Sequence, residues 1–240
     1  SAGSGIIVLI PAAVLWKEHI PGLASLLWAA GAGLFGGIGI TCLYYALSLG
    51  NTASVAPIAG VVGAILPVLV SMATEGLPGW TRLAGFGVAF LGIGLVSSTS
   101  GPATHTQRRG ILLAFIAGFG FAGFFVLIAQ VKPGEVFAPL VASRLVDLVL
   151  ALILLRTGGL AIPSPRANPI ALLAGVLDAG GNVFFLLARQ LTRLDVTAVL
   201  ASLYPASTML LAYLILKEKI SMKQWIGAAL CILAISLITI

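Results

Sequence analysis

Long apolar runs occupy most of the sequence, and they limit the folds that this chain can adopt. A membrane-spanning helix needs about 20 apolar residues, so the length accommodates about nine such helices with short connections. Glycine, proline and charged residues separate the runs. They cover residues 1–16, 23–48, 53–73, 82–98, 110–131, 136–156, 169–189, 196–216 and 223–240. We therefore predict an all-α protein, a polytopic bundle of membrane helices.

The composition excludes most other classes of protein. Hydrophobic residues make up 60% of the chain and charged residues only 8%, whereas a soluble domain has about 25% charged residues. So few charges cannot solvate the surface of a 24.5 kDa globule, which argues against a soluble enzyme, a nucleic-acid-binding domain and a disordered chain. The net charge of +6 fits basic residues at helix ends that face lipid headgroups. The expected partner is the lipid bilayer, not a nucleic acid.

The first apolar run is shorter than the others. It starts at Ser1, and only Ile6 to Trp16 are continuously apolar. It lacks the charged first segment of a signal peptide. We expect it to be part of a helix, with sequence upstream that this chain does not include.

The two halves of the chain share an internal repeat. Residues 46–98 align with 188–240, and with a one-residue gap Glu75 meets Glu218, each at the end of one helix just before the next. An odd number of helices in each half would make the repeats inverted, as in many secondary transporters. The predicted domains are a first repeat over 1–98, a polar linker over 99–109 and a second repeat over 110–240.

Several segments of the repeat resemble a known family. The second half contains ARQLTRLDVTAVLASLYP (188–205), LILKEK (214–219) and WIGAA (225–229), and the first half contains YALSLGN (45–51) and VAPI (55–58). These segments, with Glu75, are similar to the EamA-type repeat of the drug/metabolite transporter superfamily. The resemblance covers essentially the whole chain.

The resemblance implies both an architecture and an activity. Members of the family have ten helices in two inverted five-helix repeats, so the first helix would be missing here and residues 1–16 would be most of the second. The implied activity is secondary active transport by alternating access, with export of a small metabolite or drug-like molecule across a bacterial inner membrane or plasma membrane. We expect a monomer or homodimer that is not an enzyme and has no cofactor or metal.

Three ionisable residues lie near the middle of predicted helices: Arg144, Asp147 and Asp178. Each costs about 2.5–3.5 kcal/mol at the centre of a membrane helix, so each should face the bundle interior with a partner. Arg144 and Asp147 share a helical face and can pair. This pair is either a structural ion pair or part of a path for substrate or protons.

Asp178 belongs to a stripe at helical spacing that combines glycine, a carboxylate, an amide and an aromatic ring. Its members are Gly175, Asp178, Asn182, Phe185 and Arg189. The equivalent positions of the first repeat are Gly33, Gly36, Ile40, Leu43 and Leu47. Because only one repeat carries the polar groups, a functional role for Asp178 and Asn182 is favoured over a structural hydrogen bond.

The charges of these residues suggest a coupling mechanism. With all three ionised, the group carries one net negative charge, and burial disfavours a charged carboxylate. Asp147 or Asp178 can then hold a proton in one state of the cycle, which permits proton-coupled symport or antiport.

The eighth apolar run has a polar centre that Pro205 interrupts. A freed backbone carbonyl near Ala201 and the nearby hydroxyls can contact substrate, or the hydroxyls can bond within their own helix. Tyr45 faces either a cavity or the membrane interface. The candidate substrate-binding residues are Asp178, Asn182, Arg144, Asp147, Tyr45, Ser202 and Tyr204.

Three other functions fit the sequence less well. An intramembrane aspartyl protease needs two carboxylates that share a proton, but Asp147 already has Arg144 as a neighbour. A channel needs a filter loop or a charged ring, and neither is evident. A lipid-carrier translocase on the same fold remains the main alternative, and it would open laterally to the bilayer.

Overall fold

A computed structural model describes residues 2–18, 20–49, 52–96, 105–159, 168–217 and 220–239. These residues form α-helices, one π-helical segment and connecting turns, and no strand occurs among them. The α-helices are α1 (Ala2–Leu15), α2 (Leu23–Ser48), α3 (Thr52–Glu75), α4 (Trp80–Val96), α5 (His105–Ile128), α6 (Phe137–Thr157), α7 (Pro169–Leu191), α8 (Leu194–Ser202), α9 (Tyr204–Leu211) and α10 (Met222–Thr239). The π-helical segment η2 is Ala212–Leu216. The predicted all-α class is confirmed.

Seven helical stretches among the described residues are long and apolar enough to cross a membrane. They are Leu23–Ser48, Ile58–Glu75, Arg108–Ile128, Phe137–Thr157, Pro169–Leu191, Leu194–Ile215 and Met222–Thr239. Two shorter apolar helices cover Gly3–Leu15 and Trp80–Val96. The chain is therefore a multi-pass membrane protein, as its apolar runs indicate.

The predicted helix over 196–216 is divided in the structure. Helix α8 ends at Ser202, Leu203 forms a turn, and α9 begins at Tyr204. Proline has no N–H to donate and fits the first turn of a helix, where no partner is needed. Pro205 occupies that turn of α9, so the chain restarts its helix there. The predicted interruption is thus a break of one residue, the turn at Leu203.

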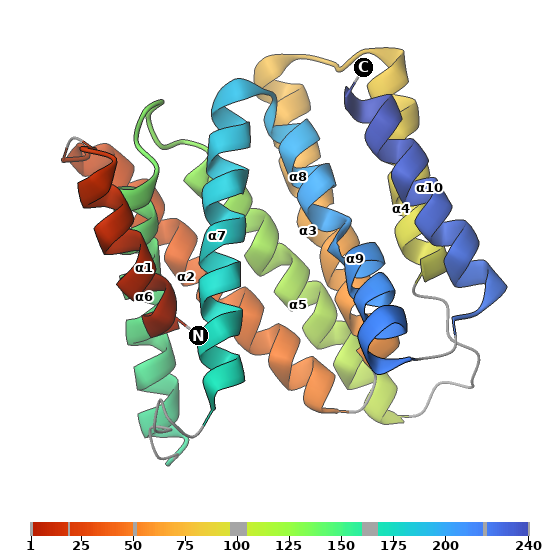
Figure 1. Cartoon of the computed structure of the whole chain (residues 1–240), viewed down its shortest axis with the longest axis horizontal. Helices are drawn as coiled ribbons and strands as arrows, with labels where there is room; N and C mark the ends of the chain where they lie inside the picture. Colours follow the sequence, from red (N-terminus) through yellow and green to blue (C-terminus); the bar gives the residue numbers. More distant parts are fainter. Residues whose placement is uncertain are drawn as a thin grey trace. The chain divides into compact units, whose positions relative to one another are not determined.

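The described residues form two compact units by their contacts. Unit 1 consists of Ser1–Ile38 and Gly123–Thr192, and unit 2 consists of Gly39–Ala122 and Arg193–Ile240. In unit 1, α1 packs against α6 and α7. In unit 2, α4 packs along α10 and α3 packs against α8 (Figure 1). Each unit is thus assembled from segments far apart in the sequence.

Glycines set the close helix contacts of unit 1. Gly33 of α2 lies against the backbone of Ser143 in α6, and a Cβ at Gly5 of α1 would be 3.1 Å from the Cβ of Ala179 in α7. Membrane helices gain little from the hydrophobic effect and associate instead through close packing of small residues. This packing brings α1, α2, α6 and α7 together around the middle of unit 1.

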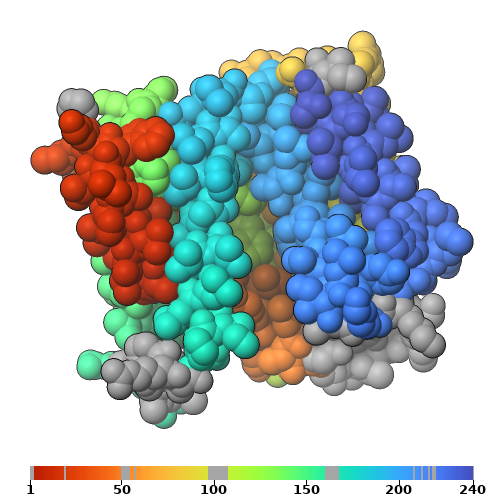
Figure 2. Space-filling model, in the orientation of Figure 1, coloured from red at the N-terminus to blue at the C-terminus, as the bar shows by residue number. Residues whose placement is uncertain are grey.

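Unit 2 has a buried apolar core between α3, α4, α8 and α10. Its members include Ile93 of α4, Val199 of α8 and Ile238 of α10. Figure 2 shows the side chains of α9 and α10 in contact within this unit. Along the α4–α10 contact, a Cβ at Gly227 would lie 2.8 Å from the backbone oxygen of Gly92. The two backbones can approach this closely only because both positions are glycine.

We expect Gly227→Ala to destabilise the protein by about 1–3 kcal/mol, because the added methyl group overpacks the α4–α10 contact. Gly94→Ala in α4 is the matched control, since a Cβ there meets no atom within 4 Å and alanine favours helix over glycine by about 1 kcal/mol. Unfolding in mixed detergent micelles gives the free energy of unfolding of both variants. Equal stability of the two variants would contradict the packing argument.

Candidate functional site

The three ionisable residues near the middle of the membrane helices form one ionic group in unit 1. The Arg144 guanidinium of α6 donates through Nη2 to Oδ2 of Asp178 in α7. Its Nη1 lies 4.0 Å from Oδ2 of Asp147, one turn further along α6. The expected pairing of Arg144 with Asp147 is present. The closer partner, Asp178, was not expected from the sequence.

The members of this ionic group differ in exposure. The side chains of Arg144 and Asp147 are 8% and 17% exposed, whereas that of Asp178 is 54% exposed. A charged group inside a membrane protein faces a partner or a water-filled space, since lipid cannot solvate it. Arg144 is therefore the enclosed cation of the group, and Asp178 is its exposed carboxylate.

Two glycines leave room for the ionic group. A Cβ at Gly37 of α2 would lie 2.8 Å from Oδ1 of Asp147, and a Cβ at Gly5 of α1 would lie 3.6 Å from Nε of Arg144. A larger residue at Gly37 would displace the Asp147 side chain, whereas at Gly5 a Cβ would reach ordinary van der Waals contact with Arg144. Four helices of unit 1 thus shape the surroundings of the group.

The polar stripe of α7 runs from the ionic group toward an aromatic pair. Asn182 follows Asp178 by one turn and is half-buried. Phe185 is buried and stacks on Phe125 of α5 at 4.5 Å between ring centroids. This face of α7 combines a carboxylate, an amide and an aromatic surface, the mixture typical of small-molecule sites.

The candidates in unit 2 surround the break between α8 and α9. The Ser202 hydroxyl donates to the carbonyl of Val199 at 2.8 Å, and the Tyr204 hydroxyl donates to the carbonyl of Ala56 in α3. A Cβ at Gly60 of α3 would lie 3.3 Å from the backbone oxygen of Ser202. Ser202 therefore bonds within α8, whereas Tyr204 bonds across to α3 and holds the break against it. Their contact with substrate stays a prediction.

Tyr45 of α2 is exposed, in unit 2. The Arg109 guanidinium of α5 lies 5.5 Å from the centroid of its ring. Such a cation–π contact contributes about 0.5–1 kcal/mol at an exposed site. This contact ties Tyr45 to α5. A role for Tyr45 in substrate binding stays a prediction.

Glu18, which no sequence motif marks as functional, caps the N-terminus of α6 with its carboxylate. It accepts hydrogen bonds from the backbone N–H groups of Val136, Phe137 and Ala138, the last two at 2.9 and 3.0 Å. A carboxylate at this end satisfies unpaired N–H groups and interacts favourably with the helix dipole. The cap fixes the start of α6, and therefore the position of Arg144 two turns later.

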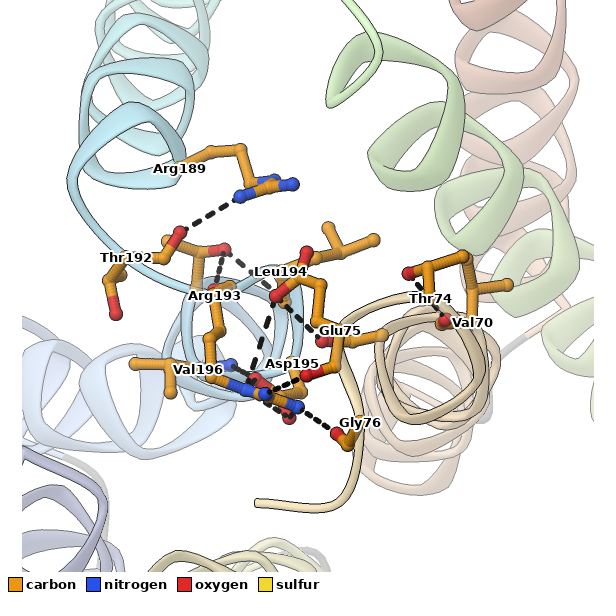
Figure 3. Close-up of polar contacts among 12 residues, drawn as sticks. Val70, Thr74, Glu75, Gly76, Arg189, Thr192, Arg193, Leu194, Asp195 and Val196 are labelled. Carbon is orange, nitrogen blue, oxygen red and sulfur yellow. Dashed lines mark hydrogen bonds and ion pairs between the residues drawn. The ribbon is translucent and has the colours of Figure 1, made fainter.

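Arg193 is a second functional candidate that the sequence analysis missed. Its guanidinium bonds to Asp195 and to backbone carbonyls at the end of α3, and Figure 3 shows these contacts. The hydrogen bond with Asp195 raises the pKa of Arg193. The available signal was the RLD segment of the family-like motif, where a basic and an acidic residue flank one leucine.

Metal ligation has no support in the described part of the chain. No group of three or more His, Cys, Asp or Glu side chains there could hold a metal ion.

Comparison with known proteins gives a family and a fold for this chain. A model of the EamA-like transporter family matches residues 108–240. An uncharacterized protein of Methanocaldococcus jannaschii is 29% identical over 131 residues, which cover 55% of this chain and 93% of that protein. One crystal structure of a protein has a TM-score of 0.70 at 20% identity, over 99% of this chain and 82% of that one. The last likeness concerns the fold alone.

We expect Arg144→Met to destabilise the protein by roughly 3–5 kcal/mol, because it leaves buried Asp147 without its cation. Asp178→Asn should cost less, about 1 kcal/mol or below, since its side chain is half-exposed and solvent screens the pair. Unfolding in mixed micelles compares the two variants. If Asp178→Asn costs as much as Arg144→Met, the guanidinium is not the centre of the group.

Proposed function

The chain belongs to the EamA-like transporter family, and we propose that it is a secondary active transporter that moves a small organic molecule by alternating access. The family match supports a membrane transporter. The observation that carries the finer proposal is the ionic group of unit 1. Its guanidinium is enclosed, and its Asp178 carboxylate is open on a polar face of α7.

The ionic group is more than a scaffold would need. A purely structural pair would pair one cation with one anion and enclose both, because an exposed charge in the membrane is costly. Here two carboxylates share one guanidinium, so the group has one net negative charge when all three are ionised. We propose that Asp178 and Asn182 contact substrate, and that Arg144 and Asp147 set the charge and position of Asp178.

The helix pairing supports the proposed repeats over 1–98 and 110–240. In that scheme α1 corresponds to α6, α3 to the broken helix α8–α9, and α4 to α10. Each of these helices packs against its own counterpart: α1 on α6, α3 on α8, and α4 on α10. Within each unit, a two-fold relation between counterpart helices, the symmetry of inverted repeats, would produce this pattern.

Coupling to protons is part of the proposal. The net charge of the ionic group can be neutralised by a proton on Asp147 or Asp178, or by a substrate that carries positive charge. Binding of a proton then competes with binding of the cationic substrate, and that competition is a physical basis for exchange of substrate against protons. Export from a bacterial cell, through the inner membrane, is the direction that the family resemblance implies.

The test is transport by purified protein in liposomes. Amino acids, organic cations and nucleosides are added in turn to wild type, Asp178→Asn and Asp178→Glu, with flux followed from pH 6 to 8. We expect flux of one class, lost in Asp178→Asn and partly kept in Asp178→Glu, because only the latter preserves the charge. Unchanged flux in Asp178→Asn would remove Asp178 from the site.

A second readout addresses the lipid translocase. The same liposomes contain a fluorescent phospholipid, and its transfer between leaflets is followed. Flux of a water-soluble class without lipid transfer supports the proposal. Lipid transfer with no flux of any soluble class would overturn it.

A further inference from the structure

Arg193 connects two helices of unit 2 that are far apart in the sequence. Its Nη1 donates to the carbonyl of Glu75 at 2.9 Å and its Nη2 to the carbonyl of Gly76 at 2.6 Å, both at the end of α3. Its Nη2 also donates to Oδ2 of Asp195 at 2.9 Å, in the first turn of α8. We call Arg193, Asp195, Glu75 and Gly76 the Arg193 latch (Figure 3).

The latch encloses a carboxylate that depends on Arg193. Asp195 has 0% exposed side chain. Its Oδ1 accepts from Nε of Arg193 at 3.1 Å and from the Val196 N–H at 2.8 Å. A buried carboxylate without its cation is strongly unfavourable. Opening of the latch is therefore unfavourable unless Asp195 reaches water.

The neighbouring acid strengthens the closed form. Oε2 of Glu75 lies 4.0 Å from Nε of Arg193 and accepts from the Ser71 hydroxyl at 3.2 Å. The guanidinium thus has two carboxylates and two carbonyls around it. Planar bidentate recognition of this kind requires arginine, because lysine offers only a point charge.

Helix α8 is short, and its two ends are held differently. At its first turn the latch ties it to α3 through a charged group. At its last residue, Ser202, it ends in the break at Leu203. Beyond the break, the Tyr204 hydroxyl bonds to Ala56 of α3. Breaks next to short helices absorb changes in backbone angle during gating motions, so α8 has a releasable end and a pivot.

The charge pattern of the latch occurs in one repeat only. With the spacing that aligns 46–98 with 188–240, the counterparts of Arg193 and Asp195 are Asn51 and Ala53. Neither residue is ionisable. Under the proposed inverted repeat, equivalent loops lie on opposite sides of the membrane, so a charged latch of this type belongs to one side.

We propose that the Arg193 latch is a gate on one side of the membrane, and that Arg193 is the positioning residue that closes it. In each cycle α8 would swing about the break at Leu203, away from the end of α3, and then return. This inference rests on the proposed transport function, because a protein without alternating access needs no gate.

The experiment uses cysteine labelling of the full chain in proteoliposomes, with Cys42 and Cys231 replaced by alanine. One reporter is Val196→Cys, beside the latch on α8, and the other is Ala234→Cys, in the core of α10. Both positions are buried. A membrane-impermeant maleimide is applied from each side, with and without Arg193→Gln.

We expect Arg193→Gln to raise the labelling rate of Val196→Cys from one side of the membrane and to leave Ala234→Cys unchanged. The rise should be at least about tenfold, as for the loss of one hydrogen bond to a charged group. Arg193→Lys should give a smaller rise, because it keeps the charge but not the planar contacts. Glu75→Gln should give a smaller rise than Arg193→Gln, because it removes only the 4.0 Å ion pair and Arg193 still bonds to the backbone carbonyl of Glu75.

Two results would overturn the proposal. One is an unchanged rate at Val196→Cys, and the other is an equal rise at both reporters, which marks general loosening. If Arg193→Gln does not fold, the double variant Arg193→Gln/Asp195→Asn replaces it, because it leaves no buried charge. The same criteria then apply to the double variant.

The outcome is separable from that of the transport assay, since labelling needs no substrate. If the protein transports but Arg193→Gln does not change the labelling rate of Val196→Cys, the gate is contradicted and the transport function is not. A responsive latch in a protein that carries no soluble substrate would support the gate and contradict the proposed substrate class.

Discussion

The interior of a bilayer neither hydrogen-bonds to exposed backbone nor solvates charge, and this constraint shapes the whole structure. It confines the spanning backbone to helices, whose N–H groups are satisfied internally. It also leaves little hydrophobic drive between helices, so contacts such as Gly92 with Gly227 depend on small residues. Every ionised side chain within the spans must then have a partner or reach water. Arg144, Asp147 and Asp178 meet this requirement by sharing one site in unit 1.

Arg144 connects the packing of unit 1 to the proposed site. Its position follows from α6, which begins at the cap that Glu18 provides and passes close to Gly5 and Gly37. Around this fixed cation, Asp178 remains half-exposed. Arg144 and Asp147 are thus the buried charged groups, whereas the Asp178 carboxylate stays exposed. In unit 2, Arg193 makes a comparable arrangement with buried Asp195 at the start of α8.

Local pattern was sufficient to predict the helices. The apolar run over 23–48 coincides with α2, and Pro205 predicted the interruption that separates α8 from α9. Contacts between side chains far apart in the sequence could not be predicted from local pattern. Arg193 bonds to a carbonyl 118 residues away, and hydrophobic periodicity does not say which helix ends meet. The contact of Arg144 with Asp178 is a second example. The cost of burying a charge predicted that each ionisable residue has a partner, but only the packing of α6 on α7 decides which residue that partner is.

Accessibility at Gly181 tests alternating access most directly. This residue lies one turn from Asp178 on α7, and a Cβ there meets no atom within 4 Å, so cysteine should be tolerated. In a background without Cys42 and Cys231, an impermeant maleimide is applied from each side of the membrane to Gly181→Cys. Alternating access predicts labelling from both sides, with a transported solute or a pH change shifting the ratio. Labelling from one side only under all conditions, or from neither, would contradict it.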